Sequence, residues 1–218
     1  AVKNHENAFE NEKAYLRKKI SVAEVLASKK ICTPLKLLDC SPVCDGASAV
    51  AVCNSSSATQ FSDTPIDILG TGEASDADFV YRQELTGFAS TRIAAKQALD
   101  MCDLKIRDMD LIEVHDAFTI NELIAYEDLG LCEKGKGGQL AESGGTTLRG
   151  EIPVNTSGGL KAKGHPIGSS GIGQVYEVFE QLSGKVTGSR KVEDASTGMT
   201  HSMGGAGVDA LVHVFRSR

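Results

Sequence analysis

The chain has 218 residues, of which 41% are hydrophobic and 24% charged, a balance typical of soluble globular proteins. Its formal net charge of −6 argues against binding to nucleic acids or membrane surfaces, which are themselves negative. No stretch approaches the roughly 20 apolar residues of a membrane span, and the polar start of the chain lacks the apolar core of a signal peptide. We therefore expect a cytoplasmic protein.

Cysteine spacing gives no sign of a disulfide framework or a metal site. The six cysteines form no C-x-x-C pair, and no Cys/His spacing typical of zinc occurs; they are Cys32, Cys40, Cys44, Cys53, Cys102 and Cys132. We predict reduced, mostly buried thiols and no bound metal.

The first sixty residues contain few regular elements. Residues 6–19 are polar and are expected to form a solvated face. Ser21 and Glu24 predict a capping box that opens a short helix. Residues 47–53 are small and β-branched, which favours a buried strand. The polar residues 55–63 then suggest a boundary, so we divide the chain into residues 1–60 and residues 61–218.

The second segment alternates strand and helix patterns. Apolar runs and an alternating C-terminal run predict strands at 66–70, 111–114, 152–155 and 208–215, with a glycine-rich turn at 197–207 between two strands. Helical patterns occur at residues 95–102, directly after a predicted Thr119–Glu122 capping box, and at residues 175–182. Residues 135–150 are predicted to form a long surface loop. The prediction is an α/β fold of order βαβαβαββ: a mixed five-stranded sheet flanked by helices, with its last two strands antiparallel.

His165 lies in the most glycine-rich part of the chain. Residues 154–174 contain six of the 23 glycines and lead directly into a helical pattern. Exposed N–H groups and the positive end of a helix dipole favour an anion, or a carbonyl oxygen that becomes one. That arrangement suits acyl chemistry, although glycine-rich loops before helices are common in α/β proteins.

The other histidines differ in their settings. His115 stands where a strand ends and a helix begins, the edge at which open α/β sheets place ligands; a lone histidine in such a turn is more often a structural hydrogen-bonding residue. His5 and His213 are given no catalytic role.

Three ordered motifs are specific in combination. They are HDAF at 115–118, NTSGGLKAKGHPIG at 155–168 and HSMGGAG at 201–207. Together they resemble the thiolase superfamily, in particular the branch of archaeal-type acetyl-CoA acetyltransferases and sterol-carrier-protein-type thiolases. Residues 34–50, PLKLLDCSPVCDGASAV, resemble the segment before the second half in that branch.

The resemblance implies a thiolase half-fold. Thiolases contain two similar halves, and their nucleophilic cysteine lies in the first. This chain resembles the second half and the end of what precedes it, and none of its cysteines lies in a segment like the nucleophile's. A C-x-S string at 53–55 is rejected because it closes the predicted strand 47–53, which matches the segment just before the second half. We expect residues 1–218 to be inactive alone; whether the first half has been removed or is a separate chain stays open.

The same resemblance implies roles for the motif histidines. His165 matches the Gly-His-Pro histidine, which implies activation of the nucleophile and contact with the thioester oxygen. His115 stands where other branches have an asparagine that holds an oxyanion-hole water. His201 stands where other thiolases carry a second catalytic cysteine, while Ala117 replaces the cysteine of sterol-carrier-protein-type enzymes. Either His201 is the second acid/base, or the reaction departs from ordinary thiolysis.

Further residues follow from the resemblance. Backbone N–H groups of Met203 and Gly204 would complete an oxyanion hole, and Ser157, Gly158 and Gly159 would line the pantetheine path. The implied activity is that of a CoA-dependent acyltransferase (acetyl-CoA C-acetyltransferase or 3-ketoacyl-CoA thiolase), with a coenzyme A thioester as substrate and no covalent cofactor. The alternatives are a non-thiolytic condensing relative and a non-catalytic acyl-CoA-binding scaffold.

Expected partners are the first half, a second copy of the chain and a small zinc-containing protein. Acyl-chain length, reaction direction and oligomeric state are left open by the sequence.

Overall fold

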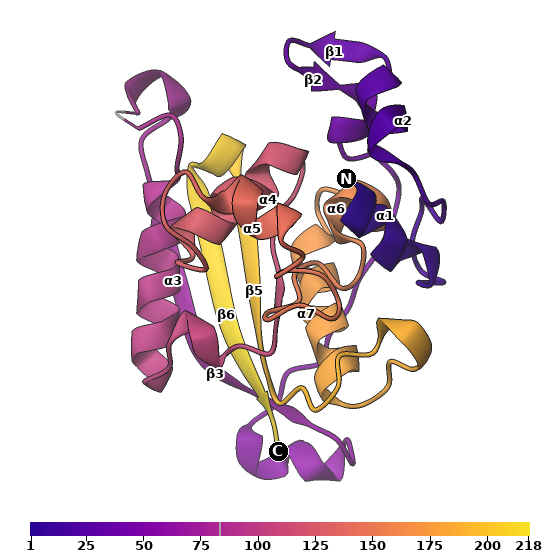
Figure 1. Ribbon diagram of the computed structural model, residues 1–218. Helices are drawn as coiled ribbons and strands as arrows, with labels where there is room; N and C mark the ends of the chain where they lie inside the picture. The colour runs from indigo at the N-terminus through magenta and orange to yellow at the C-terminus, as the bar shows by residue number, and fades with distance from the viewer. Residues whose placement is uncertain (83) are drawn as a thin grey trace.

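The computed structural model describes residues 1–82 and 84–218. A twisted mixed sheet has helices on both of its faces, and a small lobe projects beside it (Figure 1). The sheet order is β3-β6-β5-β4, with strands β3 (Ile66–Ser75), β4 (Leu111–Glu113), β5 (Thr197–Gly204) and β6 (Asp209–Ser217). β4 and β5 are parallel and the other neighbours are antiparallel. The predicted α/β class is confirmed, as is the antiparallel pairing of the last two strands.

Among the described residues this sheet has four strands, where five were predicted. Residues 152–155 make only an isolated parallel bridge, Ile112 to Val154. The Pro153 carbonyl accepts a hydrogen bond from Ile112 N, but Pro153 has no N–H to extend the ladder. Asn155 then turns into the left-handed region at φ 56° and ends the extended run.

Two apolar layers hold the helices against the sheet. On one face, α3 (Ala89–Cys102) and α4 (Thr119–Asp128) cover the larger core, which includes Ala94, Ala98, Tyr126, Met199 and Val212. On the other face, α7 (Ser170–Leu182) places Val178 and Leu182 against Leu111 and Phe215. The alternation predicted for the last strand is confirmed, since Ala210, Val212 and Val214 are all fully buried.

The glycine-rich stretch 197–207 is mostly strand, which corrects the prediction of a turn. Residues 197–204 form β5, and only Gly205–Gly207 make the turn to β6. Positive φ angles at Gly205, Ala206 and Gly207 reverse the chain there. Small residues in β5 had suggested a turn, but their size serves packing: a Cβ on Gly198 would lie 2.7 Å from a Val178 methyl.

The charged side chains of residues 6–19 are exposed, as predicted for a solvated face, while amide side chains of the same N-terminal region are buried. Helix α1 (Val2–Phe9) packs beside α6 (Gly159–Lys163) (Figure 1). Its buried polar side chains are Asn4, His5 and Asn7, and Asn11 follows. Amide side chains can satisfy backbone groups of another segment, so polar residues can be interior here.

The projecting lobe contains α2 (Val22–Ala27), β1 (Lys30–Cys32) and β2 (Leu35–Lys36). The Ser21–Glu24 capping box is confirmed. The predicted Thr119–Glu122 capping box is not formed, because Phe118 and not Thr119 is the N-cap of α4. Thr119 Oγ1 donates to Asp39 instead, and Glu122 is buried. The predicted loop 135–150 contains helix α5 (Gly137–Glu142).

Residues 47–53 are exposed and form no strand, so the predicted buried strand is wrong for this chain. No described segment pairs with their backbone. The cysteines are free but not mostly buried as predicted, because Cys32 and Cys53 are exposed and the rest are intermediate. Short 3₁₀ turns complete the fold at Leu37–Asp39, Ser55–Gln60, Phe79–Tyr81, Ile106–Asp108 and Gly188–Arg190. None of the described helices is long and apolar enough to cross a bilayer.

Close contact between β3 and α3 depends on glycine. A Cβ added to Gly72 would lie 1.9 Å from the Ala94 carbonyl oxygen, so Gly72→Ala must push the helix away from the strand. We expect a loss of about 1–3 kcal/mol in the free energy of unfolding. Gly138→Ala is the matched control, because nothing lies within 4 Å of its added Cβ and alanine favours the helix by about 0.5–1 kcal/mol. Urea unfolding measures both; equal stabilities would contradict this packing argument.

Candidate functional site

Strand register brings His115 and His201 together. Glu113 of β4 is paired with Thr200 of β5 in a parallel ladder. The next residues therefore place Val114 beside His201 and His115 just beyond the end of β4. Two histidines 86 positions apart in the sequence thus come together where β4 ends, with His201 inside β5.

His165 reaches the same place from the loop between α6 and α7. The rings of His115 and His165 meet edge to face, with centroids 5.1 Å apart. The backbone N–H of His165 donates to the Pro42 carbonyl, and Val43 bridges to His165. The three motif histidines therefore form one cluster, although they come from three separate elements.

Ser170 fixes the orientation of the His165 ring. Its hydroxyl donates to the Pro166 carbonyl at 3.0 Å and lies 2.9 Å from His165 Nδ1. Because the one hydroxyl hydrogen is used, we assign Nδ1 as the N–H that donates to Ser170 Oγ. The lone pair of His165 is then on Nε2, the nitrogen left for chemistry.

All three histidines favour the neutral form. Burial, with the nearby His115, lowers the pKa of His201 to about 3. Burial and the nearby His165 lower the pKa of His115 to about 4, and burial lowers that of His165. Neutral imidazoles can accept or donate a proton near pH 7. His201 is fully buried, whereas His115 and His165 are partly exposed, so the prediction that all three lie on one pocket edge is not met by His201.

Asp116 connects the turn of His115 to the segment that leads to His165. Its buried carboxyl group accepts hydrogen bonds from the backbone N–H groups of Leu160 at 2.6 Å and Lys161 at 3.2 Å, at the start of α6. A Cβ on Gly159 would lie 2.3 Å from Asp116 Oδ2, so only glycine allows this approach. Burial raises the pKa of Asp116 to about 8.

Asn155 connects the same segment to β4 and α4. Its Oδ1 accepts from Val114 N at 2.9 Å, and its Nδ2 donates to Glu122 Oε2 at 2.8 Å. Burial alone would raise the pKa of Glu122, but its ion pair with Lys3 and hydrogen bonds from Tyr126 and Asn4 bring it to about 2. The site is therefore supported by a buried polar network that includes the N-terminal helix.

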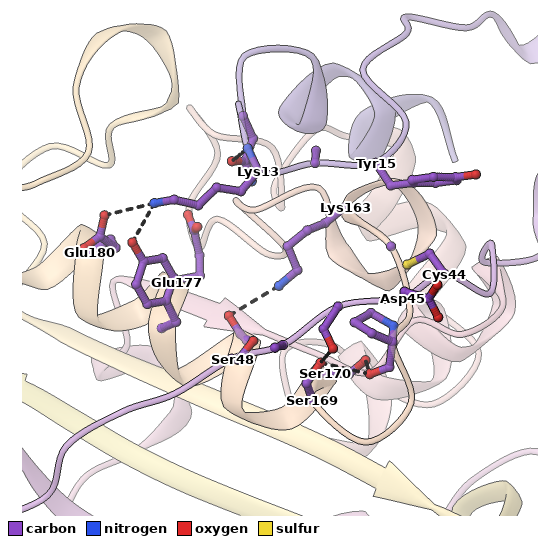
Figure 2. A pocket seen from close by; sticks show the side chains of 18 of the residues that line it. Lys13, Tyr15, Cys44, Asp45, Ser48, Lys163, Ser169, Ser170, Glu177 and Glu180 are labelled. Carbon is purple, nitrogen blue, oxygen red and sulfur yellow. Dashed lines mark hydrogen bonds and ion pairs between the residues drawn. The ribbon is translucent and has the colours of Figure 1, made fainter.

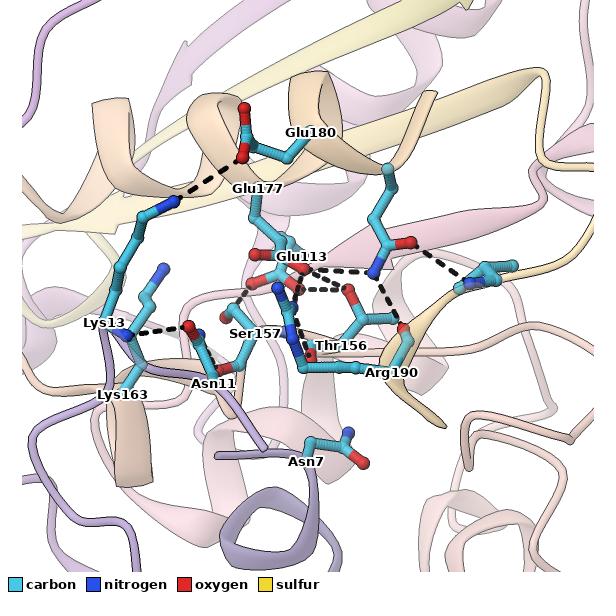
Figure 3. Close-up of polar contacts among 12 residues, drawn as sticks. Asn7, Asn11, Lys13, Glu113, Thr156, Ser157, Lys163, Glu177, Glu180 and Arg190 are labelled. Carbon is cyan, nitrogen blue, oxygen red and sulfur yellow. Dashed lines mark hydrogen bonds and ion pairs between the residues drawn. The ribbon is translucent and has the colours of Figure 1, made fainter. Parts of the chain in front are cut away.

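A second network lies on the α7 face of the sheet (Figure 3). The buried Glu113 carboxylate accepts from Ser157 N at 3.0 Å, Ser157 Oγ at 2.5 Å and Thr156 Oγ1 at 3.2 Å. Glu177 of α7 accepts from Thr156 and forms an ion pair with Arg190. Burial raises the pKa of Glu113. These bonds fix the loop directly before α6.

The predicted pantetheine-path residues are in the interior. Ser157, Gly158 and Gly159 are all buried, and a Cβ on Gly158 would lie 2.6 Å from the Ala8 Cβ. Their small size is explained by packing against α1 and Asp116, without a ligand. The predicted contact with substrate stays a prediction.

The two predicted oxyanion donors point in opposite directions. Thr197 O accepts from Asp110 N on the β4 side, whereas Ser196 O accepts from Ser217 N on the β6 side. Backbone direction alternates along a strand, so Met203 N–H faces the β4 edge and Gly204 faces β6. β4 ends at Glu113, which leaves the edge next to Met203 open beyond the His115 turn. The geometry favours Met203 and not Gly204.

A cavity of about 480 Å³ lies behind the loop of His165, between residues 11–15, residues 44–49 and α7 (Figure 2). The three motif histidines are not among its lining residues. Lys163 extends into it and makes one long hydrogen bond, 3.4 Å, to the Gly173 carbonyl. In the part of the chain that the structure describes, no group of three or more His, Cys, Asp or Glu side chains is placed to hold a metal ion.

Comparison with known proteins decides the family. The model of the thiolase C-terminal domain-like family matches residues 71–217. The chain belongs to that family.

Relatives agree with this membership. The chain is 47% identical over 216 residues to an acetyl-CoA acetyltransferase of Methanothermobacter thermautotrophicus, covering 99% of the chain and 56% of that protein. It is 36% identical over 208 residues to sterol carrier protein 2 of Bos taurus, covering 93% of the chain and 38% of that protein. The chain thus spans about half, or less, of the length of these relatives.

Solved structures share the fold. A structure described as an Ltp2-ChsH2(DUF35) aldolase aligns with a TM-score of 0.82 at 23% identity, over 97% of this chain and 56% of that one. A monomeric SCP2-thiolase-like protein of Mycobacterium smegmatis aligns with a TM-score of 0.72 at 14% identity, over 99% and 44%. At these identities the likeness concerns the thiolase-like fold alone.

The structure adds residues that sequence reasoning missed. Asp116 and Asn155 lie inside quoted motifs, so their motif membership was a signal that could have identified them. Thr91 and Glu113 have no such signal: each lies in an ordinary helix or strand pattern, and its role depends on a tertiary contact.

Buried neutral histidine makes stability depend on pH. The pKa of His201 is about 3 in the folded chain, against about 6.5 when unfolded. The unfolded state therefore binds the extra proton first, and stability falls as pH drops below about 6.5. His201→Gln removes this proton, so its stability should fall less steeply between pH 6 and 4, by about 1.4 kcal/mol per pH unit. Urea unfolding across this range measures the slopes; parallel curves for the variant and the wild type would contradict the assignment.

Proposed function

We propose that this chain is the histidine-bearing part of a CoA-dependent acyltransferase of the thiolase type. The observation that carries the proposal is the convergence of His115, His165 and His201 at one end of the sheet. The acetyl-CoA acetyltransferase relative supports it. A scaffold that only bound acyl-CoA would not need three neutral imidazoles gathered at one place.

Each histidine has a role that its position allows. His165 presents an Nε2 lone pair that can take the proton of a cysteine thiol, and the resulting thiolate attacks the acyl carbonyl carbon. His115, beside it, can donate a hydrogen bond to the oxyanion or to a water that binds it. His201 is the second acid/base, for the substrate α-carbon or the incoming thiol. Met203 N–H, at the open edge of β5, is a candidate oxyanion donor.

The thioester would lie along residues 40–43. Cys40 bridges to Phe118 and Val43 bridges to His165, so this segment crosses both histidine turns. Apolar side chains remain exposed around it: Val43 is 79% exposed, Ile167 73% and Phe118 40%. An acyl chain or a pantetheine arm would cover such surface.

The acyl-carrying cysteine would come from a first thiolase half outside residues 1–218. Residues 47–53 support this, because an extended apolar segment with an unpaired backbone favours pairing with another sheet. In this proposal residues 1–60 complete the first half, and residues 61–218 form the second domain. A second copy of the chain and a small partner protein, such as the DUF35 component named with the aldolase structure, are proposed assembly partners. The six free thiols suit a reducing cytoplasm.

A condensing or bond-cleaving relative without thiolysis is the second candidate. Ala117 stands at one usual thiol position and His201 at the other. The aldolase named among the structural neighbours has the same fold. A histidine in place of a thiol still moves protons at a carbon next to a carbonyl, which serves either reaction.

The two candidates and the need for a first half can be tested together. The chain is mixed with acetoacetyl-CoA and CoA, alone or with a cysteine-bearing first half, and loss of the enolate absorbance is followed. We expect no turnover from the chain alone and turnover when the first half is added. Turnover by the chain alone would contradict the incomplete-site proposal. Carbon–carbon cleavage that needs no CoA would favour the second candidate.

His165→Ala should lower kcat of the assembled enzyme by about 100-fold or more, the usual effect of losing a general base. His213→Ala is the matched control, since His213 lies on β6 and stacks on Phe215 away from the cluster. Equal activity of the two variants would remove His165 from the mechanism.

A further inference from the structure

Thr91 of α3 is the side chain that contacts the ring of His201. Both residues are fully buried. Thr91 Oγ1 lies 2.9 Å from His201 Nε2 and 3.7 Å from Met203 Sδ. His201 Nδ1 is also buried and has no hydrogen-bond partner among the described residues. The two ring nitrogens therefore have very different surroundings.

Counting hydrogens distinguishes the two tautomers. Burial lowers the pKa of His201 to about 3, so at neutral pH the ring has one N–H. If Nδ1 carried it, that N–H would be buried without an acceptor, while Nε2 accepted from Thr91. An unsatisfied buried donor or acceptor costs about 1–3 kcal/mol, and Nδ1 is one or the other in both tautomers. If Nε2 carries the hydrogen, it donates to Thr91 Oγ1, and the hydroxyl hydrogen points to the Met203 sulfur. Every donor then has an acceptor, and the contact with the Met203 sulfur is a hydrogen bond that the other tautomer does not make.

We propose that Thr91 is a positioning residue that holds His201 in the Nε2–H tautomer and leaves the lone pair on Nδ1. The orientation is fixed from two sides, because Gln174 of α7 donates to the His201 carbonyl at 3.1 Å while Thr91 holds the ring from α3. In the acyl transfer proposed above, on which this last step rests, Nδ1 is the nitrogen left to accept a proton, and Nε2–H stays bonded to Thr91.

The adjacent residue provides a matched control. Ser90 is also fully buried, and its hydroxyl donates to the Gly207 carbonyl at 2.9 Å. Ser90→Ala therefore removes a buried hydrogen bond from the same turn of α3 without changing the contacts of the His201 ring. Thr91→Val removes the hydroxyl with little change of shape, and Thr91→Ser restores it.

The tautomer can be read directly by NMR. Long-range ¹H–¹⁵N correlation of the chain with labelled histidine separates protonated from unprotonated ring nitrogens, and His201→Gln identifies the His201 signals. We expect the Nε2–H pattern in the wild type, Thr91→Ser and Ser90→Ala, and a mixture of both tautomers in Thr91→Val, where neither nitrogen has a hydrogen-bond partner. An Nδ1–H pattern in the wild type, or an unchanged pattern in Thr91→Val, would overturn the proposal. The wild-type and Thr91→Ser spectra decide it if Thr91→Val does not fold.

Kinetics of the enzyme assembled with its first half test the catalytic consequence. Thr91→Val should lower kcat about tenfold, the equivalent of one hydrogen bond, with KM within about twofold, and Thr91→Ser should restore kcat. In a His201→Gln background Thr91→Val should have no further effect; an equal loss in that background would show a merely structural role and overturn the proposal. The NMR result does not depend on turnover, so failure of the acyltransferase proposal is distinguishable from failure of this one.

Discussion

The carboxyl group of Asp116 is the contact on which the rest of the site depends. It follows His115 directly and binds the first backbone N–H groups of α6, the helix that leads to His165. One buried group therefore sets the distance between two loops that are far apart in the sequence. Asn4 of the N-terminal helix also donates to it at 2.7 Å, which explains why this polar side chain is buried.

Burial gives the histidine cluster its chemical character. Each ring is held neutral by its surroundings, and two of them have a neighbouring hydroxyl that determines which nitrogen keeps the hydrogen. Ser170 acts in this way on His165, and Thr91 on His201. A neutral imidazole with a fixed tautomer offers one defined lone pair, which is what a general base requires.

The fold class and the motif histidines could be predicted because periodicity and short motifs are local properties of the sequence. The exposure of residues 47–53 could not be predicted, because it depends on whether another segment pairs with them. The burial of Asn4, Asn7 and Asn11 could not be predicted, because their amides hydrogen-bond to residues more than 100 positions away. Thr91 gave no signal, since a threonine in a helix reaches His201 only after α3 packs on the sheet. The assignment of Ser157, Gly158 and Gly159 to a ligand stays a prediction, since packing also explains their size.

The central claim is that the three imidazoles surround the reacting carbonyl group of a CoA thioester. A crystal structure of the assembled enzyme with bound acetyl-CoA tests it most directly. We predict that the thioester oxygen lies within hydrogen-bonding distance of His165 and of His115, or of a water held by His115, with pantetheine along residues 40–43. Acetyl-CoA bound with its thioester remote from both histidines would contradict the account.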